Sequence, residues 1–303
     1  MGPNMSLRTW FAVAGVLAFS TECGLASAAE KERTIYTKDT LYTTILVKED
    51  RHGLRTLWFR GDDEPQSAGK VDDPDHIAFE YVQAMPVALA LVKEPKRVLV
   101  VGLGGGTLPN LLHKHYPQMV IDTVDIDPDV VDAAKRFFGF RADTTMHAYV
   151  GDGRQFIEEC KVPYDIVFLD AYGSEDIPYH MATKEFLQAV RRATAPNGIV
   201  ASNIWAAGAN RLHDPMVRTF QEVFDSVYIV AVKEDPNEII LALPTKTVVA
   251  RAELARLSSQ LSKDQKLRFD IGAYVRSGFR NSSPKTRAAR VLLDQDKRAS
   301  PPQ

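Results

Sequence analysis

The sequence predicts an α/β fold in which a small N-terminal β-hairpin domain precedes a doubly wound, mostly parallel seven-stranded sheet. Apolar runs alternate with helical segments from Arg97 onward, a glycine-rich turn follows the first of these runs, and residues 33–61 alternate in the manner of strands. The chain has 303 residues, of which 45% are hydrophobic and 25% charged, so it can bury a core of this size.

Residues 1–29 are expected to be a signal peptide rather than part of the fold. Arg8 precedes an apolar run from Trp10 to Phe19, and the small residues 26–29 follow where signal peptidase would cut. The run is about half as long as the roughly 20 residues that span a bilayer, so no stable membrane span is expected. The mature chain is expected outside the cytoplasm, in the periplasm, or in the cytoplasm if the segment is not used.

Residues 30–75 are expected to form the small β domain and a linker. Strand-like alternation over residues 41–47 and 54–59, with a charged turn between them, predicts an antiparallel hairpin. The polar stretch 61–75 then leads into an apolar helix over about residues 76–91.

Residues 76–250 are expected to form a Rossmann-like domain, followed by a C-terminal helical region, 251–303, with a loose end from about Asn281. Buried runs such as Val98–Val101 and Ile166–Leu169 are typical of a parallel sheet that is covered on both faces. The last two predicted strands are expected to pair as an antiparallel edge hairpin. The predicted strands are 97–101, 119–125, 146–150, 164–170, 198–203, 226–233 and 237–243.

A glycine-rich turn follows the first parallel strand and opens a helix. Its glycines let a ligand approach the backbone, and the helix N-terminus offers free N–H groups; the alternative is a merely tight turn. Asp125 ends the second strand about 20 residues further on, the spacing at which a carboxylate accepts hydrogen bonds from both ribose hydroxyls. Together these features predict a nucleoside-binding site. The glycines concerned are Gly102, Gly104, Gly105 and Gly106.

Three further acids follow parallel strands. Asp127 precedes Pro128 and is interpreted as a helix N-cap. Asp152 and Gly153 follow the third strand, where a carboxylate can receive the adenine amino group or simply cap a turn. Asp170 ends a buried strand, where it can accept a proton from an attacking amine, attract a sulfonium charge or only order the next loop.

The partner is expected to be a small molecule, and a homodimer is compatible with the sequence. A formal net charge of -2 predicts no nucleic-acid binding. His113 and His115 are two residues apart on a predicted helix and so face different sides, and no metal site is expected. Removal of the signal would leave Cys160 as the one cysteine, with no intramolecular disulfide.

The stretch from Val98 to Asn203, with the hairpin in front of it, resembles the spermidine synthase family of polyamine aminopropyltransferases, which share the class I methyltransferase fold. The resemblance implies a transferase of polyamine biosynthesis that uses S-adenosylmethionine or its decarboxylated form and no metal. It implies that Asp125 holds the ribose, Asp152 holds the adenine, and Asp170 is the catalytic base. The implied reaction moves an alkyl group, aminopropyl in this family, from a sulfonium nucleoside to an amine or another nucleophile.

The chain departs from the family pattern where the family binds its amines. Gly105 stands in place of the aspartate that holds the aminopropyl amine, and Gly173 in place of the one that grips putrescine. Thr43 replaces a glutamine of the hairpin, and Ala78 and Phe79 align with the tyrosine and glutamine that close the pocket. Because a neutral pocket does not offset the desolvation of a dication, putrescine is expected to be a poor acceptor.

Two acids of the next loop, Glu175 and Asp176, either replace the missing anionic end or are simply solvated, and His180 lies near the expected site. Two alternatives stay open: an S-adenosylmethionine-dependent methyltransferase, and an exported nucleoside-binding protein without catalytic activity.

Overall fold

The computed structural model describes residues 32–171, 177–233, 236–282 and 288–299. The predicted signal peptide lies outside these residues, as do Gly173, Glu175 and Asp176. Within the described part of the chain, no helix combines the length and the apolar character needed to cross a membrane.

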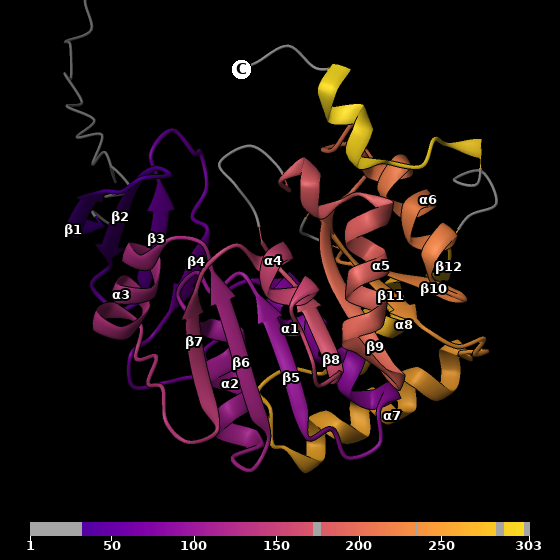
Figure 1. Ribbon diagram of the computed structural model, residues 1–303. Coiled ribbons are helices and arrows are strands. Elements are labelled where there is room, and N and C mark those ends of the chain that lie inside the picture. The colour runs from indigo at the N-terminus through magenta and orange to yellow at the C-terminus, as the bar shows by residue number, and fades with distance from the viewer. Residues whose placement is uncertain (1–31, 172–176, 234–235, 283–287, 300–303) are drawn as a thin grey trace, which may run out of the picture. The chain divides into compact units, whose positions relative to one another are not determined.

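The N-terminal sheet has four antiparallel strands in the order β1-β2-β3-β4 (Figure 1). The expected hairpin is present: Ile45 pairs with Phe59, and the carboxylate of Asp50 accepts hydrogen bonds from the N–H groups of His52 and Leu54 in the turn. Strands on either side extend the hairpin to the full sheet. The strands are β1 (Arg33–Asp39), β2 (Thr44–Glu49), β3 (Arg55–Phe59) and β4 (Ser67–Gly69).

The large sheet has eight strands in the order β12-β10-β11-β9-β8-β5-β6-β7. The run from β9 to β7 is parallel, and β10 and β11 form the expected antiparallel hairpin, with β11 also antiparallel to β9. The strands are β5 (Arg97–Val101), β6 (Val120–Asp125), β7 (Met146–Val150), β8 (Tyr164–Leu169), β9 (Thr194–Trp205), β10 (Ser226–Ala231), β11 (Asn237–Leu243) and β12 (Phe279–Asn281). The chain order reverses between β5 and β8, which is where ligands bind in doubly wound sheets. The doubly wound fold is thus confirmed, with β12 as an additional edge strand.

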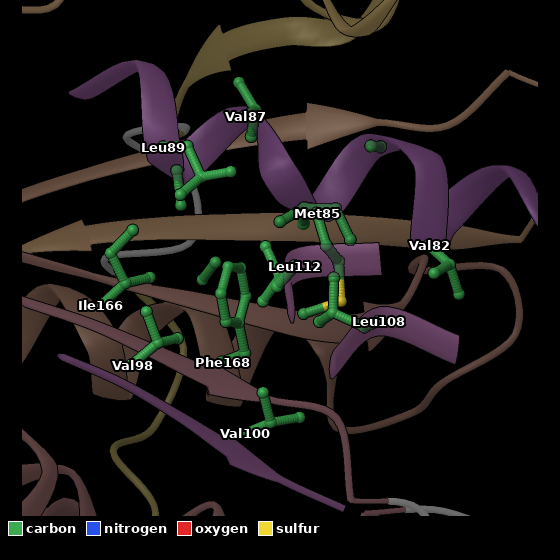
Figure 2. Close-up of a cluster of buried hydrophobic side chains, with 14 of the residues drawn as sticks. Val82, Met85, Val87, Leu89, Val98, Val100, Leu108, Leu112, Ile166 and Phe168 are labelled. Atoms are coloured by element: carbon green, nitrogen blue, oxygen red, sulfur yellow. The ribbon is translucent and has the colours of Figure 1, made fainter. Parts of the chain in front are cut away.

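Helices cover both faces of the large sheet, as the continuous apolar strands predicted. On one face, α1, the 3₁₀ helix η1 and α2 pack against β5 and β8 through residues such as Met85, Leu112 and Phe168 (Figure 2). On the other face lie α4, α5 and α6. The helices are α1 (Glu80–Ala84), η1 (Met85–Leu91), α2 (Thr107–His115), α3 (Pro128–Phe137), α4 (Gly153–Glu158), η2 (Tyr179–Met181), α5 (Lys184–Ala193), α6 (His213–Val223), α7 (Arg251–Asp264) and α8 (Ile271–Gly278).

The N-terminal sheet packs on α3, whose Val130 and Ala133 join Ile45 and Leu57 in a third apolar cluster. Arg55 donates a hydrogen bond from Nη1 to the carbonyl of Phe137 at 2.9 Å and closes the end of α3 onto β3. Because α3 also packs against the large sheet, it fixes the two sheets to each other and places the β2–β3 hairpin over the carboxyl ends of the parallel strands.

The C-terminal region differs from the expected loose end. Residues 279–281 form β12 beside β10, and residues 288–299 run against α5 and α6, where Leu292 is fully buried. The polar composition of this stretch predicted a loose end because the burial of a single apolar residue, Leu292, and the hydrogen bonds around it are not visible in composition.

Candidate functional site

A cavity of about 370 Å³ lies at the carboxyl ends of the parallel strands, with the N-terminal sheet and α1 forming its other walls. The position follows from the topology, because the strand order reverses between β5 and β8 at this edge. Of the residues that the sequence singles out for a nucleoside site, the cavity wall contains Gly102, Gly104, Asp125, Asp152, Gly153 and Asp170.

Only the first part of the glycine turn, Gly102 to Gly104, lines the cavity. Gly102 has φ +93°, and a Cβ there would lie 2.2 Å from the carbonyl oxygen of Asp170, so glycine is required by a close backbone approach. Gly104, with φ +51°, lines the cavity. The turn therefore holds two neighbouring strand ends together and leaves Gly102 and Gly104 in the cavity wall.

Gly105 and Gly106 do not line the cavity, contrary to their expected role as binding residues. A Cβ at position 105 would lie 2.8 Å from Oγ of Ser67 and 3.0 Å from the ring of Phe138. At position 106 it would lie 3.0 Å from the ring of Phe140. These glycines allow close packing of the turn against β4 and the residues that follow α3, whereas Gly102 and Gly104 line the cavity.

Asp125 ends β6 and lies in the cavity wall beside the glycine turn. Its Oδ2 accepts a hydrogen bond from the N–H of Leu103 at 2.9 Å, and its Oδ1 accepts one from the N–H of Asp127 at 3.0 Å. Burial raises the pKa of Asp125 against the opposing effect of these backbone donors. Each carboxylate oxygen can accept a second hydrogen bond, so the expected contact with two ribose hydroxyls is chemically available.

Asp127 is the N-cap of α3, as predicted: its Oδ1 accepts from the N–H of Asp129 at 2.9 Å. The structure adds a feature that the capping pattern could not show. Asp127 lines the cavity, and its buried Oδ2 has no hydrogen-bond partner among the described residues. Since buried polar atoms are normally paired, this oxygen is a candidate acceptor for a bound ligand.

Asp152 caps a helix and also lines the cavity. Its Oδ1 caps α4 by accepting from the N–H groups of Arg154 at 2.7 Å and Gln155 at 3.0 Å. Its Oδ2 lies 3.3 Å from Nε2 of His180, and both residues line the cavity. His180, noted in the sequence only for its position, thus belongs to this wall together with Met181 from the same turn, η2.

Asp170 follows β8 and reaches the cavity from the centre of the sheet. Burial raises the pKa of its carboxyl group to about 7, although a hydrogen bond from Nδ2 of Asn203, at 2.9 Å, acts in the opposite direction. Oδ1 of Asn203 in turn accepts from Nδ2 of Asn237 at 2.7 Å, and both asparagines are buried. A group with this pKa exchanges a proton readily near neutral pH.

Asn203 and Asn237 are site residues that the sequence patterns did not indicate. Asn203 lies near the carboxyl end of β9, the strand next to β8, and a polar residue there could have been flagged by the rule that found Asp170. Asn237 lies at the start of an antiparallel strand, just after a turn, and its sequence context is typical of a turn residue. Its contact with Asn203 depends on the pairing of β11 with β9, which the sequence does not show.

The wall opposite the nucleoside residues comes from the N-terminal sheet and α1. Thr43 is part of it, as are Tyr42, Phe59 and Gln66. From α1 the cavity receives Tyr81 and Val82 rather than Ala78 and Phe79, because the helix begins at Glu80 and Phe79 packs against the apolar core. Ala78 and Phe79, which align with the pocket-closing residues of the family, are therefore not part of the described cavity wall.

The described wall is acidic. It contains the carboxylates of Asp125, Asp127, Asp152 and Asp170 and no lysine or arginine, and His180 is its one basic side chain. A cavity that concentrates negative charge favours a cationic ligand. Across the described residues, no group of His, Cys, Asp and Glu side chains is arranged to hold a metal ion.

Known proteins resemble this chain in sequence and in fold. Residues 78–239 match a family model described as the spermine/spermidine synthase domain. A polyamine aminopropyltransferase from Vibrio vulnificus is 30% identical over 289 residues, which cover 92% of this chain and 95% of the relative. An eEF1A lysine and N-terminal methyltransferase from Bos taurus is also 30% identical, over 66% of this chain but only 31% of the relative.

Solved structures show the same fold. A probable spermidine synthase from Corynebacterium glutamicum superposes with a TM-score of 0.68 at 18% identity, covering 86% of this chain and 96% of that one. Human methyltransferase-like protein 13, solved with SAH, superposes with a TM-score of 0.56 at 26% identity, covering 68% of this chain and 96% of that one. The family model and the full-length bacterial relative decide the assignment: the chain belongs to the spermine/spermidine synthase family and is a transferase.

Proposed function

We propose that this protein transfers an alkyl group from a sulfonium nucleoside to an amine, with Asp170 as the proton acceptor. The observation that carries the proposal is a carboxyl group with a pKa raised to about 7 in the same cavity as Asp125, Asp152 and the glycine turn. Asp125 would hold the ribose and Asp152 the adenine, so the sulfonium would lie toward Asp170.

The chemistry requires little covalent help from the protein. The lone pair of the amine attacks the carbon next to sulfur, the carbon–sulfur bond breaks, and its electron pair stays on sulfur as a neutral thioether. The new ammonium group gives a proton to Asp170. Position and charge supply the acceleration, because the anionic wall stabilises the cation and the buried carboxylate is a base of suitable strength.

Decarboxylated S-adenosylmethionine is the donor that the wall favours. S-adenosylmethionine carries a carboxylate, for which the described wall offers no lysine or arginine, whereas the decarboxylated form carries only positive groups. The aminopropyltransferase relative supports the same donor. Methyl transfer is the second candidate, supported by the methyltransferase relatives and by the glycine turn, which has Gly105 where the family has the aspartate for an aminopropyl amine.

The deciding experiment measures binding and turnover with both donors. We expect decarboxylated S-adenosylmethionine to raise the unfolding temperature more than S-adenosylmethionine, and to support transfer to monoamines better than to putrescine, since Gly173 provides no second carboxylate. Stronger stabilisation by S-adenosylmethionine, with methylated product, would establish the second candidate instead. Binding without turnover of either donor, across a panel of amines, would leave a nucleoside-binding protein.

We also propose that the chain is exported, on the strength of Arg8, the apolar run to Phe19 and the small residues 26–29. Mass spectrometry of the protein from its own host should then find a mature N-terminus near Ala29 or Glu30, outside the cytoplasm. Full-length protein with Trp10 still attached, in the soluble cytoplasmic fraction, would contradict export.

A further inference from the structure

Residues 288–299, named here the C-terminal segment, are anchored between α5 and α6. The N–H of Leu292 donates to Oγ1 of Thr219 at 3.0 Å, and the carbonyl of Leu292 accepts from the N–H of Lys184 at 2.8 Å. The Leu292 side chain is fully buried in the apolar cluster on this face of the sheet. This anchor brings the next residues of the segment to the N-terminal ends of α4 and α5.

Asp294 makes the most specific contacts of the segment. Its two carboxylate oxygens accept from Nη1 and Nη2 of Arg154 at 2.7 and 2.6 Å, and Oδ1 also accepts from Oγ1 of Thr183 at 2.7 Å. Its N–H donates to Oε2 of Glu185 at 3.0 Å. A two-point pair between a guanidinium and a carboxylate fixes orientation as well as distance. Asp294 therefore holds Arg154 in one geometry from a position 140 residues later in the chain.

Arg154 connects Asp294 to two elements of the cavity wall, α4 and η2. It lies in the first turn of α4, two residues after Asp152, and its Nη1 also donates to the carbonyl of His180 at 3.0 Å. His180 belongs to η2, a turn of only three residues, and its Nε2 contacts Oδ2 of Asp152. Arg154 thus joins the two elements that supply Asp152, Gly153, Pro178, His180 and Met181 to the cavity.

We propose that Asp294 is a positioning residue for nucleoside binding: through Arg154 it holds α4 and η2 at the spacing that the adenosine half of the donor requires. Asp294 does not line the cavity itself, so its effect is exerted on Asp152 and His180. The inference rests on the proposed function only for the identity of the ligand. The C-terminal segment lies outside residues 78–239, which match the family model, so the proposed role belongs to a part of the chain beyond that match.

The test is calorimetric binding of 5′-methylthioadenosine, which presents the adenosine half common to both candidate donors. Asp294→Asn keeps the shape and removes the charge of the pair with Arg154, and we expect the Kd to rise about fivefold or more. Glu222→Gln is the matched control: this carboxylate of α6 pairs with Arg218 of the same helix and with Lys184 of α5, is similarly exposed, and has no hydrogen bond or ion pair to the described residues of α4 or η2. The control should bind like the unmodified protein.

Further variants separate positioning from general stability. Because Asp294 acts through Arg154, the double variant Arg154→Gln with Asp294→Asn should bind no more weakly than Arg154→Gln alone. Asp294→Glu, which keeps the charge, should recover much of the affinity, and in turnover Asp294→Asn should raise KM with little change in kcat. If Asp294→Asn does not fold, Arg154→Lys provides the second variant, since it keeps a charge but cannot make the two-point pair and the His180 contact together.

The outcomes distinguish the two proposals. No binding of the nucleoside to the unmodified protein would refute the proposed function. Binding by the unmodified protein with an unchanged Kd in folded Asp294→Asn would refute the positioning role, as would additive losses in the double variant.

Discussion

Asp170 is held by an amide rather than by a cation, and this choice of partner sets its chemistry. An arginine or lysine beside a buried carboxylate would lower its pKa and weaken it as a base. The Asn203 amide orients the carboxylate with one hydrogen bond and leaves burial as the dominant effect, so the pKa stays near 7. Asn237 in turn fixes the amide of Asn203, so the base is oriented from two strands.

We expect Asp170→Asn to lower kcat/KM by about 100-fold or more, because positioned bases contribute rate factors of that size. In the unmodified protein the rate should rise with pH through about 7, as Asp170 loses its proton. Steady-state assays from pH 5 to 9 measure both effects, with Asp132→Asn, an exposed helix acid paired with Arg136, as the control. A variant of full activity would exclude Asp170 as the base.

Asn203→Ala should move the same pH profile to higher pH. The Asn203 amide donates to Asp170 and lowers the carboxyl pKa, so its removal leaves the effect of burial less opposed. At a pH high enough to ionise Asp170, the Asn203→Ala variant should recover much of the rate of the unmodified protein. An unchanged midpoint of the pH–rate profile would mean that the amide does not tune the base.

At the scale of elements, the strands and the doubly wound class were accessible to sequence reasoning, whereas contacts between distant segments were not. The apolar runs identified β5 and β8 because strands buried on both faces have few other compositions. The acids at the strand ends followed from the same topology. Gly105 and Asp294 show the limit: the first faces packing neighbours in β4 and α3, and the second pairs with Arg154. Local patterns carry no information about such partners.

The glycine turn offers a direct test of one such close approach. Gly102→Ala would place a methyl group 2.2 Å from the carbonyl oxygen of Asp170 at φ +93°, so we expect a loss of about 2 kcal/mol or more in the free energy of unfolding. Gly151→Ala is the matched control, because a Cβ there meets no atom within 4 Å and the backbone needs no positive φ. Urea unfolding compares them, and equal stabilities would show that the turn can separate from β8 without cost.

For the whole molecule, buried groups with opposite pKa shifts determine how stability depends on pH. Burial alone would raise the pKa of Asp122, but hydrogen bonds from His147, Tyr164 and Arg97 outweigh it and lower the pKa. Its contribution to stability is present above the ordinary pKa of aspartate and is lost as pH falls through the lowered value.

Asp170 acts in the opposite direction. Its pKa rises from 3.8 to about 7 on folding, so the folded state holds the proton more tightly. The contribution of Asp170 to the free energy of unfolding is complete below its pKa in the unfolded chain, 3.8, and is lost as pH rises toward 7. His213 adds to the same side: burial alone would lower its pKa, but hydrogen bonds with Glu238 and Asp214 outweigh it and raise the pKa. Its contribution is present below the ordinary histidine value and is lost above the raised one.

From these groups we therefore expect the free energy of unfolding to peak at roughly pH 4, between the ranges in which Asp122 and Asp170 act, and to decline on both sides. Asp170→Asn removes a carboxyl group whose charged form is costly to bury. The free energy of unfolding of this variant, relative to that of the unmodified protein, should therefore increase from pH 4 to pH 8. Asp122→Asn should do the reverse, with its deficit shrinking as pH falls below 4. Urea unfolding at constant ionic strength across this range gives all three curves. Parallel curves for Asp170→Asn and the unmodified protein would mean that the folded carboxyl group is already ionised at pH 5, and the base would then have an ordinary aspartate pKa rather than one set by burial.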